Sequence, residues 1–432
     1  MARDEGKGER MSAADDERIP LGIQCAVYAS GLFANSLAYM VTLVVPLWVL
    51  TLEPSALVIG VVLGSRHFLT LLLSIHSGAL MDRLGARRVM VFFAVLCMMV
   101  PVFYPMLPWI PAVIGLQMLL GLATSTGWTG AQTLIGQVMK GNPIYAGRLS
   151  FSIRIGVFVG PPLIGVAWDH LGPWGAFSIM SLWATGSLIA ALALPETHPG
   201  APAVTDAAHG ADRGKEGDGR GGEDGKVALG DLMPKLSDHI AAFRLMAIPA
   251  VVFVVAVTML RMAGNGIQTS FYVVYLQSID ITATEIGLLL AVASILGGAG
   301  ALAIGPVARI FRPHWLLLIT VTGSIVLIAI TPLLGTFFLL MIASGLRGGT
   351  MGMSQPLMIS ILSRATGRES QGKSVGLRAT ANRLTATFLP VIMGGIVEFA
   401  GLEASLLIIG AVLVALMALL AVHVKRTPAL SD

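Results

Sequence analysis

Five arginines lie inside long apolar segments of the chain, namely Arg66, Arg154, Arg261, Arg347 and Arg383. An arginine at the centre of a bilayer costs roughly 2.5–3.5 kcal/mol, so it is expected to face water and a partner. No aspartate or glutamate lies deep in any of these segments, and the planar donor fork of arginine suits carboxylate or phosphate. The pattern predicts that Arg66 and Arg261, with Arg347, bind an anionic group. A structural role, such as hydrogen bonds to helix ends, stays an alternative for each.

Other polar residues of the apolar segments extend this candidate site. Arg154 and Arg383 lie nearer one end of their segments, in equivalent places of the chain, and we interpret them as a pair that gates the site. His67 and His76 titrate near neutral pH, so either could carry a coupled proton, although a packing role is equally open. Uncharged amides could complete a cavity, and the candidates are Asn35, Asn265, Gln268, Gln132 and Gln355.

The sequence contains no motif that indicates catalysis or metal binding. We find no nucleophile–base pair, no cluster with metal-ligand spacing and no phosphate-binding glycine loop that rises above chance. The sequence therefore predicts neither an enzyme nor a bound metal or cofactor. The two cysteines, Cys25 and Cys97, both lie in apolar stretches, so a disulfide framework is not expected either.

The composition places these residues in a membrane. Hydrophobic residues make up 55% of the 432-residue chain and charged residues only 12%, whereas a soluble domain carries roughly a quarter charged residues. Apart from the five arginines above, every Lys and Arg falls in the termini or in the loops on one side of the apolar segments. Because basic residues are retained on the cytoplasmic side, we expect a multi-pass protein of the inner membrane with both ends inside. The net charge of +4 then reflects topology, and no nucleic-acid partner is expected.

Twelve apolar segments are long enough to span a bilayer, which takes about 20 residues each. They predict an all-α membrane protein with two bundles of six helices, at 21–195 and 245–424, and cytoplasmic tails at 1–20 and 425–432. Residues 196–244 are rich in Gly and in charged side chains, which predicts a disordered cytoplasmic linker. The spans lie near 22–50, 55–80, 88–107, 110–138, 147–170, 174–194, 246–276, 283–305, 315–334, 336–362, 376–399 and 403–424.

The two groups of spans repeat each other. Residues 147–172 and 376–401 match at a constant offset of 229. The matched pairs are Gly147/Gly376, Arg154/Arg383, Pro161/Pro390, Gly165/Gly394, Asp169/Glu398 and Gly172/Gly401, and Ser55/Thr282 and Gly60/Gly287 match at an offset of 227. Duplicated halves are typical of transporters that bind their substrate between the halves. The repeat therefore predicts two pseudo-symmetric bundles with a site between them.

A motif after the second span points to a family. The run from Gly78 to Arg88 fits the pattern G-x-x-x-D-R-x-G-x-R-R. With this motif and the six-plus-six repeat, the chain resembles the major facilitator superfamily of secondary transporters, outside its tails and linker. The resemblance implies that Gly78 allows close helix packing, that Gly85 forms a tight turn, and that Asp82 faces a helix N-terminus of the other half as a conformational latch. The other members of this latch are Arg83, Arg87 and Arg88.

A second motif refines the resemblance. Span five contains Gly156, Gly160, Pro161 and Gly165, which is similar to the Gly-Pro pattern of drug/proton antiporters, where proline kinks the helix and glycine permits close contact. The chain departs from those antiporters at Gln117, where they usually place an arginine, and by the lack of an acid deep in a span. The resemblance favours export, and helix packing alone is the other interpretation of these glycines.

The combined pattern predicts a secondary active transporter that moves a small organic or amphipathic anion outward by alternating access. Two alternatives stay open. One is proton-coupled uptake of such an anion, and the other is a non-transporting sensor or assembly factor built on the same scaffold. The resemblance further implies that the protein works as a monomer in the lipid bilayer.

Overall fold

A computed structural model describes residues 19–139, 143–196 and 245–427, and within these ranges the chain is helical without a strand. Helices suit a membrane protein because they satisfy every backbone N–H and C=O within one segment, where no water is present to do so. The expected linker at 196–244, apart from Glu196, and most of both expected tails lie outside the described residues.

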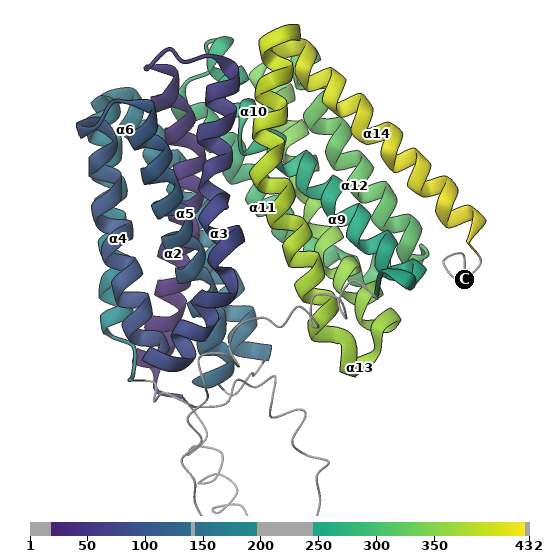
Figure 1. The fold of residues 1–432 in the computed structure, drawn as a ribbon, viewed down its shortest axis with the longest axis horizontal. Coiled ribbons are helices and arrows are strands. Elements are labelled where there is room, and N and C mark those ends of the chain that lie inside the picture. Colours follow the sequence, from purple (N-terminus) through teal and green to yellow (C-terminus); the bar gives the residue numbers. More distant parts are fainter. Residues whose placement is uncertain (1–18, 140–142, 197–244, 428–432) are drawn as a thin grey trace, which may run out of the picture.

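The first half of the chain forms five helical elements on one side of the molecule (Figure 1). The last of them, α6, reverses direction at Gly172, whose φ is +65°, a conformation that glycine adopts without steric cost. It therefore crosses the bundle twice, as the separate spans 147–170 and 174–194 predicted. The elements are α2 (Leu21–Leu50), α3 (Ala56–Leu84), α4 (Ala86–Met106), α5 (Ile110–Gln137) and α6 (Pro143–Leu192).

The second half lies beside the first, and its longest element, α13, also folds back on itself (Figure 1). Arg347 bonds to Gln268 and Leu389 packs on Gly266, so two parts of α13 contact neighbouring residues of α9. A straight helix would separate Arg347 from Leu389 by about 63 Å. The elements are η2 (Leu245–Ala247), α9 (Pro249–Gln268), α10 (Phe271–Ser278), α11 (Ala283–Val307), α12 (Pro313–Ala329), η3 (Thr331–Leu333), α13 (Phe337–Ala400) and α14 (Leu402–Arg426).

The described helices account for all twelve predicted spans. Nine helical stretches are long and apolar enough to cross a membrane by length and composition. The second pass of α6, the shorter apolar helix Pro313–Ala329 and the first arm of α13 supply the remaining crossings. The prediction of an all-α polytopic membrane protein with two six-helix bundles is confirmed.

Span seven differs from its prediction as one continuous helix over 246–276. The helix α9 ends at Gln268, and α10 starts at Phe271. The two residues between them, Thr269 and Ser270, both donate a side-chain hydroxyl to the carbonyl oxygen of Gly266, one turn back. Such side-chain bonds compete with the helical backbone pattern. The apolar periodicity of the segment gave no sign of this break.

The bundle has two distinct ends. We call the end that carries the turns at 51–55, Gly172 and Gly401 the Asp169 end, and the opposite end, with the turn at Gly85, the Gly85 end. The two halves meet at the Asp169 end and diverge toward the Gly85 end (Figure 1). At the Gly85 end, α3 continues to Leu84, four residues beyond the predicted span, and Gly85 turns the chain with a φ of +85°.

Candidate functional site

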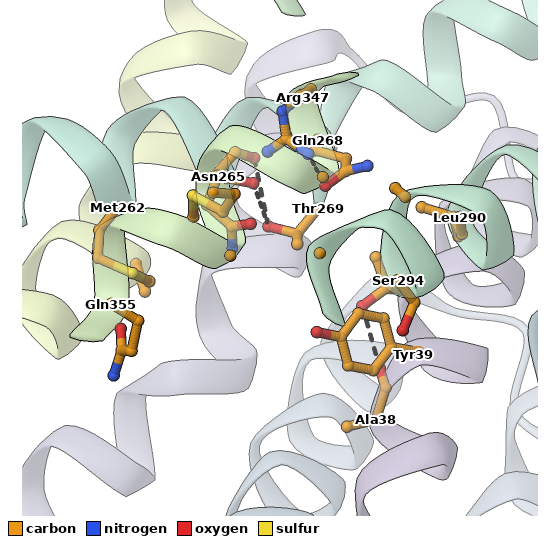
Figure 2. Close-up of a pocket in the computed structure, with 18 of the residues that line it drawn as sticks. Ala38, Tyr39, Met262, Asn265, Gln268, Thr269, Leu290, Ser294, Arg347 and Gln355 are labelled. Atoms are coloured by element: carbon orange, nitrogen blue, oxygen red, sulfur yellow. Dashed lines mark hydrogen bonds between the residues drawn. The ribbon is translucent and has the colours of Figure 1, made fainter. Parts of the chain in front are cut away.

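A cavity of about 460 Å³ lies between the two halves and is lined by residues of both. Its volume falls in the range of small-molecule sites. Figure 2 shows Arg347 and Gln268 beside Asn265 and Thr269, with Tyr39 and Ser294 of other helices facing them. The polar lining residues are Tyr39, Thr42, Arg66, His67, Gln117, Arg154, Asn265, Gln268, Thr269, Ser294, Arg347 and Gln355.

Arg66 is the cationic group that α3 contributes to the cavity. It lies ten residues from Ala56, the first residue of α3, which places it about 15 Å along the helix. The backbone of Gly121 on α5 packs directly against the carbonyl of Arg66, where any side chain would collide. This contact fixes the position of Arg66 along the length of α5. There its Nη1 donates to Thr42 Oγ1 of α2, at 2.9 Å.

Arg347 is the corresponding cationic group of the second half. The residue is only 3% exposed, and its Nη1 donates to Gln268 Oε1 at the end of α9. Its Nε and Nη2 are buried and have no partner among the described residues. Those two donors form one edge of the guanidinium group, and such an edge can bind an oxyanion in a bidentate manner. A buried donor without a partner costs free energy, so an acceptor that bonds to both donors would stabilise this side chain.

Arg261 stands one layer behind the cavity wall. Its Nη2 donates to Gln355 Oε1 at 2.9 Å, and its Nη1 contacts Met351 Sδ at 3.2 Å. Both partners line the cavity, whereas Arg261 itself does not belong to the lining. Its contact with a ligand therefore stays a prediction. Its charge lies directly behind the cavity wall, because the side chains of Gln355 and Met351 that contact it both line the cavity.

The charge of the cavity is entirely positive. Every charged residue of the described lining is an arginine, and no aspartate or glutamate is among them. The side-chain partners of Arg66, Arg261 and Arg347 are a hydroxyl, two amides and a thioether, all of which are neutral. Because a buried charge is costly unless it is paired, this arrangement favours a negatively charged ligand.

The two arginines that we expected to form a gate do connect the halves. Arg154 Nη1 on α6 donates to the carbonyl oxygen of Ser294 on α11, at 3.0 Å. Arg383 Nη1 on α13 donates to the carbonyl oxygen of Thr70 on α3, at 2.7 Å. The two bonds are pseudo-symmetric, since each runs from one half to a helix backbone of the other. Arg154 also lines the cavity.

Three of the predicted binding amides, Asn265, Gln268 and Gln355, line the cavity, and so does His67, a candidate for proton coupling. The side chain of His76, the other such candidate, lies outside the described residues.

Two of the predicted binding amides lie elsewhere. Asn35 is one helical turn nearer the Gly85 end than Tyr39, and Gln132 is 15 residues beyond Gln117, the residue through which α5 lines the cavity. Fifteen residues amount to about 22 Å along the helix. Asn35 and Gln132 are therefore not part of the described lining, and their role in binding stays a prediction.

Five polar residues of the lining were not predicted as site residues. They are Tyr39, Thr42, Gln117, Thr269 and Ser294. Tyr39 and Thr42 are three residues apart and share one face of α2, a signal that the sequence contains. Thr269 belongs to the break between α9 and α10, which periodicity does not reveal.

The predicted latch motif is described only in part. The surroundings of Gly78 and the side chains of Asp82 and Arg83 lie outside what the structure describes. Gly85 adopts the left-handed conformation that the expected tight turn requires. The other two members, Arg87 and Arg88, lie in the first turn of α4. Arg87 donates to the carbonyl oxygen of Leu192 at 2.8 Å and pairs with Glu196 at 3.7 Å, while Arg88 is exposed.

The glycines of span five make two different kinds of contact. Gly156 and Gly160 pack against Leu32, Ser36 and Met40 of α2, within the first half.

Gly165, by contrast, packs on the carbonyl of Ala283, and Gly287 packs on that of Pro161, so α6 meets α11 across the halves. The repeat-related residues do the same on the other side, where Gly394 meets Ala56 and Gly60 meets Pro390.

Two repeat-related carboxylates cap helix N-termini across the halves at the Asp169 end. Asp169 accepts hydrogen bonds from the backbone N–H groups of Ala283 and Thr284, at 3.1 and 2.8 Å. Glu398 accepts from the backbone N–H of Leu57 at 3.1 Å. The N-terminal N–H groups of a helix lack partners within the helix and carry a partial positive charge. Together with the glycine contacts, these caps hold the Asp169 end closed.

A twelve-helix membrane protein whose two halves enclose a polar cavity is built as a transporter of small molecules. The chain belongs to the Major Facilitator Superfamily, which its sequence matches over residues 27–255 and 254–432. It is a secondary transporter, as the sequence motif and repeat predicted, and not an enzyme.

Solved structures of other transporters share this fold. A mutant of the nucleoside transporter NupG is 14% identical, with 93% of this chain and 99% of that chain covered, at a TM-score of 0.73. A POT family transporter in complex with 5-aminolevulinic acid is 11% identical, with 95% and 96% covered, at a TM-score of 0.70.

A bacterial homolog of the human lysosomal transporter Spinster, in an inward-facing and unoccupied conformation, is 14% identical, with 93% and 94% covered, at a TM-score of 0.65. At these identities the likeness concerns the fold alone. The search of curated proteins finds no match.

Proposed function

We propose that this protein exports a small organic anion across the inner membrane by alternating access. The observation that carries the proposal is the arginine-lined cavity between the halves. Arg66 and Arg347 face it with neutral side chains as their partners, and no carboxylate is among its described lining. A cavity of this charge favours an anion and disfavours a cation.

The break in span seven supports the same class of ligand. The helix α10 starts at Phe271, two residues after Thr269 in the cavity wall. Its first N–H groups have no partner within the helix and carry the positive end of the helix dipole toward the membrane centre. Half-helix N-termini of this kind point at anionic substrate groups in transporters with broken helices.

The proposed orientation places the Gly85 end in the cytoplasm. Basic residues gather there, with Arg87, Arg88, Arg309 and Arg426 as described members, and basic loops are retained inside. Since the halves are joined at the Asp169 end, the structure then corresponds to an inward-facing state. The Gly-Pro pattern of span five is the feature that favours export. One chain supplies both walls of the cavity, which supports function as a monomer.

The test is thermal stabilisation of the purified protein by a panel of carboxylates, phosphorylated metabolites, organic cations and neutral drugs. A ligand at a hundredfold excess over its Kd adds about 2.7 kcal/mol to the free energy of unfolding, which is readily measured. We expect anions alone to stabilise the wild type, and Arg66→Gln and Arg347→Gln to abolish the effect.

Arg309→Gln is the matched control, because Arg309 is an exposed arginine of the Gly85 end, away from the cavity. It should respond to anions as the wild type does. Stabilisation by cations or neutral drugs, retained in the two cavity variants, would overturn the proposal. Flux into proteoliposomes then separates a transporter from a sensor, since a sensor binds the anion and moves none.

A further inference from the structure

The cavity presents separate cationic groups on its two walls. Arg66 belongs to α3 of the first half and Arg347 to α13 of the second. Both line the same cavity. Each has one donor held by a neutral side chain, namely Thr42 for Arg66 and Gln268 for Arg347. These bonds orient the two guanidinium groups without neutralising them.

Two further arginines add positive charge around the same space. Arg154 lines the cavity while it donates to a backbone carbonyl, and a carbonyl does not neutralise it. Arg261 lies behind Gln355 and Met351, and its Nε is buried without a partner in the part of the chain that the structure describes. A ligand with one negative charge would leave most of this positive charge uncompensated between the halves, where like charges repel.

We propose that the substrate carries at least two anionic groups, one bound by Arg66 and the other by the free edge of Arg347, so that one molecule bridges the two halves. This inference rests on the proposed function and specifies the class of anion, namely small dicarboxylates, tricarboxylates or phosphorylated acids. A polyvalent anion satisfies the buried donors Nε and Nη2 of Arg347 and balances the charge of both walls.

The rest of the lining fits the backbone of such a molecule. Leu63, Met262 and Leu290 supply apolar surface between the two walls, and Asn265 and Thr269 supply groups that can bind hydroxyls. The volume of about 460 Å³ accommodates a short chain with a charged group at each end. The substrate is therefore expected to be an acid with two or three charges and few carbon atoms.

A homologous series of carboxylates tests the charge requirement. The purified protein is titrated with propionate, succinate and tricarballylate at pH 7.5, with the ionic strength held constant by NaCl, and the Kd of each is read from its thermal shift. 3-Phosphoglycerate and methyl phosphate form a second pair that adds a carboxylate to a phosphate. We expect the Kd of succinate, tricarballylate and 3-phosphoglycerate to lie at least tenfold below that of the matching monofunctional compound.

The variants Arg66→Gln and Arg347→Gln locate the two sub-sites. Each should remove the preference for the second anionic group, which brings the Kd of succinate to within about threefold of that of propionate in the same variant. Arg309→Gln should keep the full preference. The unliganded melting temperature of each variant shows whether it folds.

The outcomes separate this inference from the function on which it rests. If propionate binds as tightly as succinate, the cavity binds anions, as the proposed function requires, but the requirement for two charges is wrong. The same follows if either cavity variant weakens propionate and succinate by equal factors. If no anion of either series shifts the melting temperature, both the proposed function and this inference are overturned.

Discussion

Arg154 and Arg383 donate to helix carbonyls of the opposite half, whereas Arg66, Arg261 and Arg347 are held by neutral side chains. The sequence shows all five only as arginines in apolar segments. Their partners place the first two at the contact between the halves, where Arg154 also lines the cavity. Of the other three, Arg66 and Arg347 line the cavity and Arg261 lies behind its wall. A bond to a helix carbonyl is a sufficient structural reason for an arginine inside the membrane. Arg347 has no such reason for Nε and Nη2, which have no partner among the described residues.

This division predicts opposite effects on stability. Arg347→Gln removes a buried charge with unpaired donors, so the empty protein should keep or gain stability, by roughly 1 kcal/mol. Arg383→Gln removes a charged hydrogen bond between the halves and should cost about 1.5 kcal/mol. The melting temperatures of both variants in the same detergent, without ligand, give the comparison. An equal loss for the two variants would contradict the division.

At the scale of elements, the repeat in the sequence identifies residues that make equivalent contacts between the halves. The pairs Asp169/Glu398 and Gly165/Gly394, found by a constant offset, lie in α6 and in the second arm of α13, and each packs on the start of a helix of the other half. The sequence identified these pairs but not their partners. It missed the cap because a carboxylate at a helix end has many possible neighbours.

The carboxylate caps predict a shift in the balance of conformations. A charge at a helix N-terminus contributes about 1 kcal/mol when exposed. Asp169→Asn should therefore reduce the population closed at the Asp169 end by roughly fivefold relative to the open one, and Glu398→Gln should do the same. The readout is the distance between spin labels at Leu171→Cys and Gln277→Cys, two exposed positions of that end in opposite halves, with Cys25 and Cys97 replaced by serine.

Asp280→Asn is the matched control for the caps, because Asp280 is an exposed carboxylate of the same end in a turn. Its distance distribution should equal that of the parent protein. An unchanged distribution in the double variant Asp169→Asn/Glu398→Gln would show that the caps do not hold this end closed.

The neighbouring glycines Gly394 and Gly395 give a test of the helix contact. A Cβ at Gly394 would meet the carbonyl of Ala56 at 2.6 Å, whereas a Cβ at Gly395 meets nothing within 4 Å. A backbone atom cannot move aside cheaply, so Gly394→Ala should open the Asp169 end. Gly395→Ala should leave it closed. Spin-label distances at the same two positions measure both variants, and equal behaviour would contradict the close packing of the halves.

The site was less predictable than the fold. The sequence shows neither the position of the cavity along the helices nor the local break in span seven. Apolar length and the repeat were enough to predict twelve helices in two halves, because the bilayer restricts the chain to helices. They do not fix how far along each helix the cavity lies. Asn35 and Gln132 were therefore expected in a lining that does not include them, and Tyr39 and Thr42 were overlooked. The break at Thr269 and Ser270 depends on side-chain hydrogen bonds, which apolar periodicity does not record.

For the whole molecule, the closed Asp169 end, the diverging Gly85 end and the cationic cavity between them describe one state of a transport cycle (Figure 1). The glycine contacts and carboxylate caps are present in both repeats, so they act as a unit on the same end. Arg66 and Arg347 line the cavity and take no part in the glycine contacts and carboxylate caps that close the Asp169 end. A bound anion that compensates Arg66 and Arg347 would link the two halves, and we expect occupancy to alter how readily the halves change their orientation.

The central claim is that the cavity binds and carries a small anion, and charge movement tests it most directly. Proteoliposomes on a solid-supported membrane are exposed to a jump in succinate, 3-phosphoglycerate or propionate concentration, with a chloride jump as the blank. We expect transient currents from the two polyvalent anions in the wild type and in Arg309→Gln, and none in Arg66→Gln/Arg347→Gln. Equal currents with and without the two cavity arginines, or no current from any anion in the wild type, would contradict the account.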